Sequence, residues 1–435
     1  MSTAPPTAAR LAQSEWRGSR YNFWGVSQSG TSLLLNGLTG ALVEMEPAEA
    51  SRVRAAFDGG AEVTPELVEQ LAELGMMVPV DLDEPALLQS RAVEGCQAGT
   101  GRLELIIAPT YACNFRCTYC YVEQRPGVLS PAAAEGIVRH VERVLDGYSA
   151  LEISWFGGEP LLCLDIVDRL TRQLRSLALD RGAEFRAFAT TNGYLLDSAA
   201  VRRLEDAGVE YLHVTVDGSR EAHDRLRVRA DGGATYDVIL SNLLGALKQS
   251  SALRFTLRAN VDHDNISEVY DLMDAIPGAH RHRIQVSVRP IMGADTEIDD
   301  VLLAGIEDAM DRAVELGFLA YPMNLQMGKT VHCAAEKEGN YYIAPDARLY
   351  SCSPLEGKSS VFVGTLCPDG RVVFADDYLP RAEHRPFSRR CAECDFLCFC
   401  MGGCPLYRTT ASDDSCKTQY ANIEQLIRSM AEVAR

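Results

Sequence analysis

Long apolar runs are missing from this sequence of 435 residues. No stretch approaches the roughly 20 consecutive apolar residues that a membrane-spanning helix needs. The first residues, 1–13, are rich in Ala, Pro and Thr and lack the apolar core of a signal peptide. These two absences predict a cytoplasmic protein that has no membrane partner.

Positive charge is also scarce, since 42 Lys and Arg against 60 Asp and Glu give a formal net charge of −18. Nucleic-acid binding needs cations that contact phosphates, so nucleic acid is not expected as the main partner. The sequence contains no P-loop, no H-E-x-x-H zinc motif and no convincing dinucleotide-binding loop. Its eight histidines form no ligand cluster, and His213 falls within an expected strand.

Cysteine, in contrast, is abundant, with fourteen residues that favour metal or iron–sulfur binding over disulfides in a reducing compartment. Cys113, Cys117 and Cys120 are spaced C-x3-C-x2-C directly after an apolar run. Three thiolates can bind three irons of a cubane cluster and leave the fourth iron open for chemistry. A zinc knuckle and buried free cysteines are the alternatives, but no His or Cys follows within the next ten residues to complete a zinc site.

From Gly101 onward, runs typical of strands alternate with helical periodicity. The expected strands are Leu103–Ala108, Leu151–Trp155, Phe185–Thr190, Tyr211–Val216, Phe255–Val261 and Arg283–Arg289. The expected helices are Pro131–Leu145, Leu164–Leu179, Ser198–Ala207, Tyr236–Gln249, Ser267–Ile276 and Asp299–Leu316. Six strand–helix units predict an α/β fold, a partial (β/α)6 barrel whose chemistry lies at the carboxyl ends of its strands.

Short polar motifs follow these strands. They are Phe156-Gly157-Gly158-Glu159-Pro160, Thr190-Thr191-Asn192-Gly193, Val214-Thr215-Val216-Asp217-Gly218 and His223-Asp224-Arg225-Leu226-Arg227. With Tyr119 before the third cysteine, the chain resembles the radical S-adenosylmethionine (SAM) enzymes, whose signature is C-x3-C-x-aromatic-C. The resemblance implies that SAM chelates the open iron of a 4Fe-4S cluster. An electron from a donor such as flavodoxin or ferredoxin would then cleave SAM to methionine and a 5′-deoxyadenosyl radical, which removes a hydrogen atom from the substrate.

The same resemblance implies a set of SAM-binding residues, and no catalytic residue beyond the cluster is assigned. The set is Tyr119, Gly157, Gly158, Glu159, Thr191, Asn192, Thr215 and Arg227. In the family, the Gly-Gly-Glu motif binds the methionine ammonium, the Thr-Asn-Gly element lines the pocket, and the aromatic residue packs near the adenine. Thr215 would lie near the ribose or carboxylate. Arg227 would bind the SAM carboxylate through a forked hydrogen bond, with a surface ion pair as the alternative.

The C-terminal third contains a second cysteine system that resembles the SPASM domain, which carries two auxiliary iron–sulfur clusters. By similarity, one cluster is bound by Cys391, Cys394, Cys400 and Cys416, and the other by Cys333, Cys352 and Cys404. Two four-iron clusters need eight ligands, so an iron stays open or Cys367 or Cys398 completes the set. Zinc remains the alternative, because C-x2-C pairs also occur in zinc ribbons. The family's glycine five residues before Cys352 is replaced by Ala347.

Four parts are expected along the chain: a disordered tail (1–16), a small domain with a linker (17–95), the barrel (100–320) and the SPASM domain (321–435). The linker is expected at 84–100. The small α+β domain combines a hairpin, two helices and a closing strand, and it resembles the winged-helix-like elements that recognise leader peptides. Leu33, Leu34 and Leu35 are expected at an unprotected sheet edge that a leader peptide could extend.

The resemblance therefore predicts a radical SAM/SPASM enzyme that crosslinks or oxidises a residue of a precursor peptide or protein. The first alternative is a formylglycine-forming enzyme like the anaerobic sulfatase maturases. Those enzymes have an Asp after the second SPASM cysteine, whereas Ser353 follows Cys352 here. The second alternative is a non-catalytic electron carrier with three clusters, which would not need the SAM-pocket motifs.

Overall fold

In a computed structural model of the chain, the structure describes residues 16–27, 29–57, 64–99, 101–291, 298–320, 328–353, 361–379, 387–404, 423 and 427. The chain forms two compact units. The smaller unit comprises residues 1–96, 321–333 and 383–435, and the larger comprises 97–320 and 334–382. Residues 321–435, expected as one domain, are therefore divided between the two units. No helix in the described ranges is long and apolar enough to cross a membrane.

The larger unit contains all six expected strands, and they lie parallel to one another. They are β6 (Arg102–Ile107), β8 (Ala150–Trp155), β9 (Glu184–Thr191), β10 (Tyr211–Thr215), β12 (Arg254–Val261) and β13 (Ile284–Pro290). Their order in the sheet follows the chain from β6 to β13, and a short β14 (Leu319–Ala320) pairs parallel with β13. This arrangement confirms the mixed α/β fold, and it brings the carboxyl ends of the strands to one edge.

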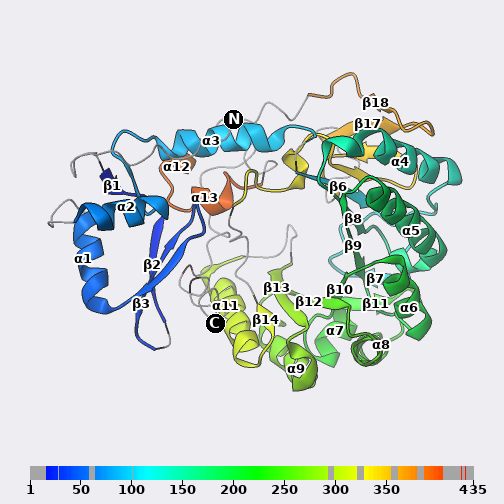
Figure 1. Cartoon of the computed structure of the whole chain (residues 1–435). Helices are drawn as coiled ribbons and strands as arrows, with labels where there is room; N and C mark the ends of the chain where they lie inside the picture. Colours follow the sequence, from blue (N-terminus) through cyan, green and yellow to red (C-terminus); the bar gives the residue numbers. More distant parts are fainter. Residues whose placement is uncertain are drawn as a thin grey trace. The chain divides into compact units, whose positions relative to one another are not determined.

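The expected helices are also present and lie outside the curved sheet (Figure 1). They are α4 (Pro131–Val144), α5 (Leu164–Asp180), α6 (Ser198–Ala207), α8 (Tyr236–Gln249), α9 (Val269–Asp274) and α11 (Asp300–Glu315). Ser130 and Asp197 accept hydrogen bonds from the first-turn N–H groups of α4 and α6, which fixes where these helices begin. Two short helices, α7 (Arg220–Leu226) and α10 (Gly278–Arg281), were not expected.

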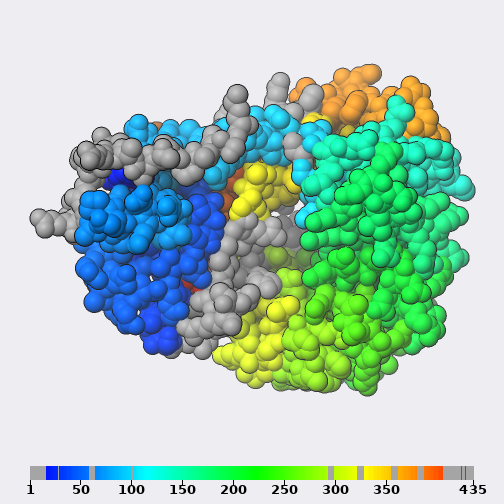
Figure 2. Space-filling view, viewed as in Figure 1, coloured from blue at the N-terminus to red at the C-terminus, as the bar shows by residue number. Residues whose placement is uncertain are grey.

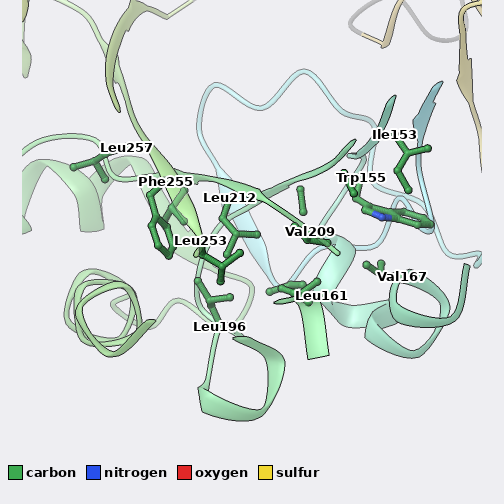
Figure 3. Close-up of a cluster of buried hydrophobic side chains, with 14 of the residues drawn as sticks. Ile153, Trp155, Leu161, Val167, Leu196, Val209, Leu212, Leu253, Phe255 and Leu257 are labelled. Carbon is green, nitrogen blue, oxygen red and sulfur yellow. The ribbon is translucent and has the colours of Figure 1, made fainter. Parts of the chain in front are cut away.

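The core of the larger unit lies between strands and helices. Side chains of β8, β10 and β12, such as Trp155, Leu212 and Phe255, meet helix and loop residues such as Val167 and Leu196 in Figure 3. In Figure 2 this part of the chain, coloured green, presents a continuous surface. Burying this apolar surface is the main driving force for assembly of the unit.

Alternate residues of the strands point away from the helices. Burial alternates along β6, β8 and β13, as expected when one face of a strand packs against helices and the other does not. The half-buried face is polar, with Glu104, Ser154, His213, Arg258 and Arg289 among its members. Burial lowers the pKa of His213 to about 4, and the charge of Arg258 acts in the same direction. The polar face therefore holds a neutral histidine among cationic groups.

Beyond β6 the sheet continues with strands from the C-terminal third. They are β15 (Tyr341–Ile343), β16 (Arg348–Tyr350), β17 (Phe362–Leu366) and β18 (Val372–Phe374), which bring the described sheet to eleven strands. β15 is parallel to β6, and the others follow as antiparallel neighbours. In the turn between β15 and β16, Ala347 has a φ of 65°, a left-handed conformation that favours glycine. Ala347 thus has the backbone conformation that explains why the similar family has a glycine at this position.

The smaller unit confirms the expected hairpin and helices but not the expected edge. Its first elements are β1 (Trp16–Gly18), β2 (Asn22–Val26), β3 (Ser32–Asn36), β4 (Leu42–Met45), α1 (Pro47–Phe57), α2 (Pro65–Glu73) and β5 (Met77–Pro79). The closing strand β5 pairs with β1, a strand at the end of the expected tail, rather than with the hairpin. β3 lies between β2 and β4, and its three leucines are fully buried. The prediction that Leu33, Leu34 and Leu35 form an edge is wrong, because a third strand pairs there.

The expected linker at 84–100 is instead mostly helix α3 (Glu84–Cys96). Leu88 and Ala92 of α3 are buried with Tyr21 and Phe23 in a cluster that also includes Leu397, Phe399 and Met401 from the C-terminal part of the chain. Glu84 is fully buried and accepts hydrogen bonds from the Ser19 hydroxyl (2.5 Å) and from Arg17 (2.8 Å). The linker prediction is wrong, because the apolar side chains of this segment are spaced as in a helix and pack against residues far away in the sequence.

We expect Ala347→Gly to stabilise the protein. Left-handed backbone costs a non-glycine residue roughly 1–2 kcal/mol, and the extra unfolded-state entropy of glycine offsets roughly 0.5–1 kcal/mol of the gain. The free energy of unfolding, measured by chemical denaturation of the reconstituted protein, should therefore rise by about 0.5–1 kcal/mol. The matched control is Ala344→Gly in the same turn: both variants lose a buried methyl, but φ is not positive at Ala344, so its stability should fall. A lower stability for Ala347→Gly would show that this turn is not strained.

Candidate functional site

The three motif cysteines lie on the loop that leaves β6. This loop contains β7 (Phe115–Cys117), which pairs antiparallel with β11 (Arg227–Arg229) so that Cys117 faces Arg227 in register. Cys120 donates its backbone N–H to the Cys117 carbonyl (3.2 Å) and completes a tight turn. The ribbon of β7 and β11 was not expected, and it fixes the cysteine loop against the motif that contains Arg227.

The glycine motif after β8 packs directly against the start of the cysteine loop. Gly158 N–H donates to the Thr110 carbonyl (3.0 Å), and Glu159 N–H donates to the Ala112 carbonyl (2.9 Å). A Cβ on Gly158 would lie 2.2 Å from the Ala112 carbonyl oxygen, and Gly157 has a φ of 125°. Both glycines are therefore needed for two loop backbones to approach each other.

Glu159 ties the same motif to the loop that follows β9. Its side chain is fully buried and accepts hydrogen bonds from the Thr191 hydroxyl (2.8 Å), Asn192 N–H (2.7 Å) and Leu161 N–H (2.9 Å). Burial raises the pKa of this carboxyl, and the three donors oppose that shift. Binding of the methionine ammonium by Glu159 stays a prediction, and the three hydrogen bonds leave this carboxylate capacity for another donor.

Asn192 links the β9 loop to the first cysteine. Its amide donates to Asn114 Oδ1 (2.7 Å) and contacts Cys113 Sγ (3.9 Å), while Phe115 N–H also donates to Cys113 Sγ (3.4 Å). N–H groups directed at thiolate sulfur are characteristic of iron–sulfur ligation, because they stabilise the charge on the cluster. The donors around Cys113 therefore fit the cluster that the spacing implies.

The three thiols influence one another electrostatically. Burial raises the pKa of Cys113 to about 11; the Phe115 N–H opposes this shift, and charge on Glu159, Cys117 and Cys120 adds to it. Metal binding must therefore displace protons, since thiolates are the ligands. In the described ranges, no three His, Cys, Asp or Glu side chains converge as a single-metal site.

Tyr119 and Arg227 are held together by a buried network. The Tyr119 hydroxyl donates to Asp217 and accepts from Arg227 Nη1 (2.7 Å) and from the Asn260 amide (3.1 Å). Arg227 Nη1 lies 3.8 Å from Asp217 Oδ2, and both side chains are almost completely buried. The surface ion pair considered for Arg227 is therefore wrong. These contacts use Nη1 of Arg227, and its Nε is buried without a hydrogen-bond partner in the described structure.

The His-Asp-x-x-Arg motif forms a chain of hydrogen bonds below this network. Asp217 N–H donates to His223 Nδ1 (3.1 Å), so His223 Nε2 carries the proton and donates to the Thr235 hydroxyl (3.0 Å). That hydroxyl donates to the Arg227 carbonyl (2.8 Å). Burial lowers the pKa of His223 to about 3, with Arg227 contributing, so the ring stays neutral. His223 thus helps to fix the backbone N–H of Asp217 directly and the backbone carbonyl of Arg227 through Thr235.

The sequence motifs therefore meet at one edge of the sheet, and each predicted residue has a defined position. Thr191 ends β9, Asn192 follows it, and both contact Glu159, while Thr215 ends β10 and is buried. Sequence reasoning missed Asn260, which donates through its backbone to Asp217 (2.8 Å) and through its amide to Tyr119. Its position near the carboxyl end of the fifth parallel strand was a signal that could have identified it.

Several expected auxiliary-cluster ligands share a compact segment of the smaller unit. Cys391 lies in α12 (Arg389–Ala392) and Cys400 in α13 (Leu397–Cys400), and Cys394 N–H donates to the Cys391 carbonyl (3.1 Å). Positive φ angles at Met401, Gly402 and Gly403 form the turn before Cys404. Cys333 belongs to the same unit, whereas Cys352 and Cys367 belong to the larger one. Cys416 lies outside the described residues.

Cys398 has the surroundings of a core residue. Its thiol is buried among Tyr21, Phe23 and Phe399, and a Cβ on Gly37 would lie 2.6 Å from its sulfur. Burial raises the pKa of Cys398 well above its ordinary range. Burial raises the pKa of Cys113 too, so the argument against Cys398 as the eighth ligand is its packing among apolar side chains.

Comparisons with known proteins extend this description. Residues 107–276 match the model of the Radical SAM superfamily. Fe-coproporphyrin III synthase of Methanosarcina barkeri is 24% identical over 340 residues, which cover 67% of this chain and 80% of that protein. GTP 3′,8-cyclase of Sulfurimonas denitrificans is 28% identical over 180 residues, and the chain spans half of that protein's length.

Two solved structures share the fold over most of their length. Native anSMEcpe with bound AdoMet and Cp18Cys peptide has a TM-score of 0.57 at 16% identity, covering 77% of this chain and 98% of that chain. Streptococcus suis SuiB bound to precursor peptide SuiA has a TM-score of 0.53 at 16% identity, covering 93% and 98%. The superfamily match includes the cysteine loop and the motifs that pack against it. The chain therefore contains a radical SAM domain.

Proposed function

We propose that this protein is a radical SAM enzyme that modifies a residue of a ribosomally made precursor peptide. The observation that carries the proposal is the joining of the Gly-Gly-Glu and Thr-Asn-Gly loops to the cysteine loop, through Glu159 and Asn192. A protein that only carried electrons would not need these loops. A bound 4Fe-4S cluster and SAM would together supply a radical that abstracts hydrogen from the substrate.

The chain's own residues would perform the binding and positioning. Cys113, Cys117 and Cys120 would hold the cluster, and Glu159 would keep the loops of β8 and β9 against it. Arg227 would bind the SAM carboxylate through the guanidinium nitrogens that Tyr119 does not use, while Asp217 and Tyr119 keep the guanidinium in place. Auxiliary clusters on the C-terminal cysteines, and an electron donor such as flavodoxin or ferredoxin, belong to the same proposal.

A peptide substrate is favoured by the smaller unit and by the fold of SuiB, whose solved structure contains a precursor peptide. The hairpin sheet has two outer strands, β2 and β4. Asn36 N–H donates to the Ala41 carbonyl, so the alternating residues Leu42 and Glu44 direct their N–H groups outward. By the same alternation, Trp24 and Val26 do so on β2. A leader peptide could extend the sheet at either strand.

A second candidate is a small carboxylated substrate such as a porphyrin. It is favoured by the 340-residue match to Fe-coproporphyrin III synthase. Turnover of a precursor peptide, with none of a porphyrin, would separate the two candidates.

We expect replacement of Cys113, Cys117 and Cys120 together by Ala to abolish formation of 5′-deoxyadenosine, because the cluster whose open iron binds SAM would be lost. The wild-type protein should hold roughly 11 to 12 irons per chain after anaerobic reconstitution if all three sites carry four-iron clusters. The triple variant should lose about four of these. Stoichiometric zinc with little iron in the wild-type protein would contradict the cluster assignment.

We expect Gly158→Ala to reduce SAM cleavage by about 100-fold or more, because displacing reacting groups by about 1 Å costs that much. The added methyl has no space beside the Ala112 carbonyl and would push the β8 loop away from the cysteine loop. The measurement is 5′-deoxyadenosine release with dithionite as reductant. Gly245→Ala in α8 is the control, since nothing lies within 4 Å of its added Cβ, and it should keep full activity. Full activity in Gly158→Ala would refute this role of the glycine.

We expect a proline in the outer strand that binds the leader to weaken leader affinity at least tenfold, because it removes an outward N–H. Val26→Pro tests β2 and Glu44→Pro tests β4, with Val26→Ala and Glu44→Ala as controls that retain the N–H. Affinity is measured by fluorescence anisotropy on precursor peptides encoded beside the gene. Deleting the domain is unsuitable, because it would expose Leu397 and Phe399 of the shared core. Unchanged leader affinity in both proline variants would rule out the proposal that the leader peptide binds by adding a strand.

A further inference from the structure

Two arginines on the polar face of the larger unit have no acidic partner. Arg258 lies on β12 and Arg289 on β13, each within three residues of the strand's carboxyl end. Arg258 is in register with Ser287, and Arg289 is two residues further along the same strand. Side chains alternate with a period of two, so both arginines project from the same face of the sheet. They are diagonal neighbours at the edge where the SAM motifs meet.

Both guanidinium groups are half-buried, and neither forms an ion pair within the described ranges. Arg258 Nε donates to Asn260 Oδ1 (2.9 Å), and Arg289 Nε donates weakly to the Ser287 hydroxyl (3.3 Å). Each of these hydrogen bonds uses only the Nε atom of its guanidinium group. The terminal nitrogens of both side chains have no acceptor among the described residues, although a guanidinium suits a carboxylate through two parallel bonds.

Keeping the two positive charges of Arg258 and Arg289 close together and partly buried costs free energy. Burial lowers the pKa of Arg289 to about 10, and the nearby charge of Arg258 adds to that shift. Burial also lowers the pKa of Arg258, although Tyr121, Tyr119 and Asp217 oppose the shift. Asp217 is already bonded to Tyr119 and paired with Arg227. Two like charges kept together without a counter-ion indicate a site that receives an anion from outside the chain.

The pair lies on other strands than the group expected to bind SAM, although Asn260 links Arg258 to Tyr119 and through it to Arg227. Arg227 is in register with Cys117 of the cysteine loop, on the ribbon formed by β7 and β11. Arg258 and Arg289 lie on β12 and β13, beyond β10 in the sheet order and away from β6, β8 and β9. A substrate that approaches the cluster from the β13 side of the sheet would meet them first.

We propose that Arg258 and Arg289 form a subsite that binds a carboxylate of the peptide substrate, an acidic side chain or a terminal carboxylate. This inference rests on the proposed peptide-modifying function and adds a requirement to it. A carboxylate held by both guanidinium groups would fix the neighbouring substrate residue relative to the cluster. The salt dependence of substrate binding follows, because charge attraction weakens as ionic strength rises.

The test uses the reconstituted full-length enzyme with saturating SAM and, as probes, N-acetyl-glutamyl amide and its neutral glutaminyl analogue. Isothermal titration calorimetry should show the glutamyl probe binding at least tenfold more tightly, since hydrogen bonds to charged groups are worth that factor. Arg258→Gln and Arg289→Gln should each weaken the glutamyl probe about tenfold or more and leave the SAM dissociation constant within about threefold. Arg254→Gln, at the exposed opposite end of β12, is the matched control and should change neither value.

Thermal stability provides an independent readout. Removing an unpaired, half-buried charge should leave the melting temperature of the ligand-free protein unchanged or raise it. A structural role would lower the melting temperature instead. Arg258→Lys and Arg289→Lys, which keep the charge but lose the fork, should bind the glutamyl probe with intermediate affinity.

Four results would overturn the subsite: no measurable glutamyl binding, equal binding of both probes, equal weakening by Arg254→Gln, or a parallel loss of SAM affinity. The last would assign the arginines to the SAM carboxylate. A protein that binds the glutamyl probe through both arginines but modifies no peptide would keep the subsite and reject the proposed function. If the enzyme modified peptides equally well with and without acidic residues, the proposed function would stand and the subsite would be rejected.

Discussion

The buried carboxylate of Glu159 is the interaction on which the site depends. It accepts hydrogen bonds from the loop of β9 while its own backbone is bonded to the cysteine loop, so three chain segments meet at one residue. A buried carboxylate is tolerated only when its oxygens are satisfied, and hydrogen bonds to such a group contribute roughly 1.5–3 kcal/mol each. The glycines before it matter for the same reason, since a side chain there would separate the loops.

A second network gives the site its charge pattern. Asp217 neutralises Arg227, and Tyr119 and Asn260 bridge the pair to the cysteine loop and to β12. His223 supports this network from below and stays neutral, so it adds no further positive charge beside Arg227. The only cations left without acidic partners at this described edge of β12 and β13 are Arg258 and Arg289. Asp217 is therefore used by Arg227, and the two arginines on β12 and β13 keep no ion pair among the described residues.

The smaller unit shows that sequence distance says little about where a core forms. Arg20 donates to the Ala392 carbonyl (3.0 Å) and the Glu393 carbonyl (2.7 Å), between two expected cluster ligands. Tyr21 and Phe23 pack with Leu397 and Phe399. The domain expected to recognise a leader peptide thus also supports the cysteine segment, and its folding is coupled to that segment.

Much of this protein could be predicted from sequence because the signals are local. Strand alternation and helical periodicity predicted the parallel sheet, and cysteine spacing with strand-end motifs predicted which residues would meet. Tertiary structure alone decided the rest. β3 became a central strand because the adjacent β4 pairs with its second edge. α3 became a packed helix because distant segments supplied its partners, and the ribbon of β7 and β11 joined residues 110 positions apart. The roles of Glu159, Asn260 and the two unpaired arginines depend on neighbours across strands, and no local pattern encodes those neighbours.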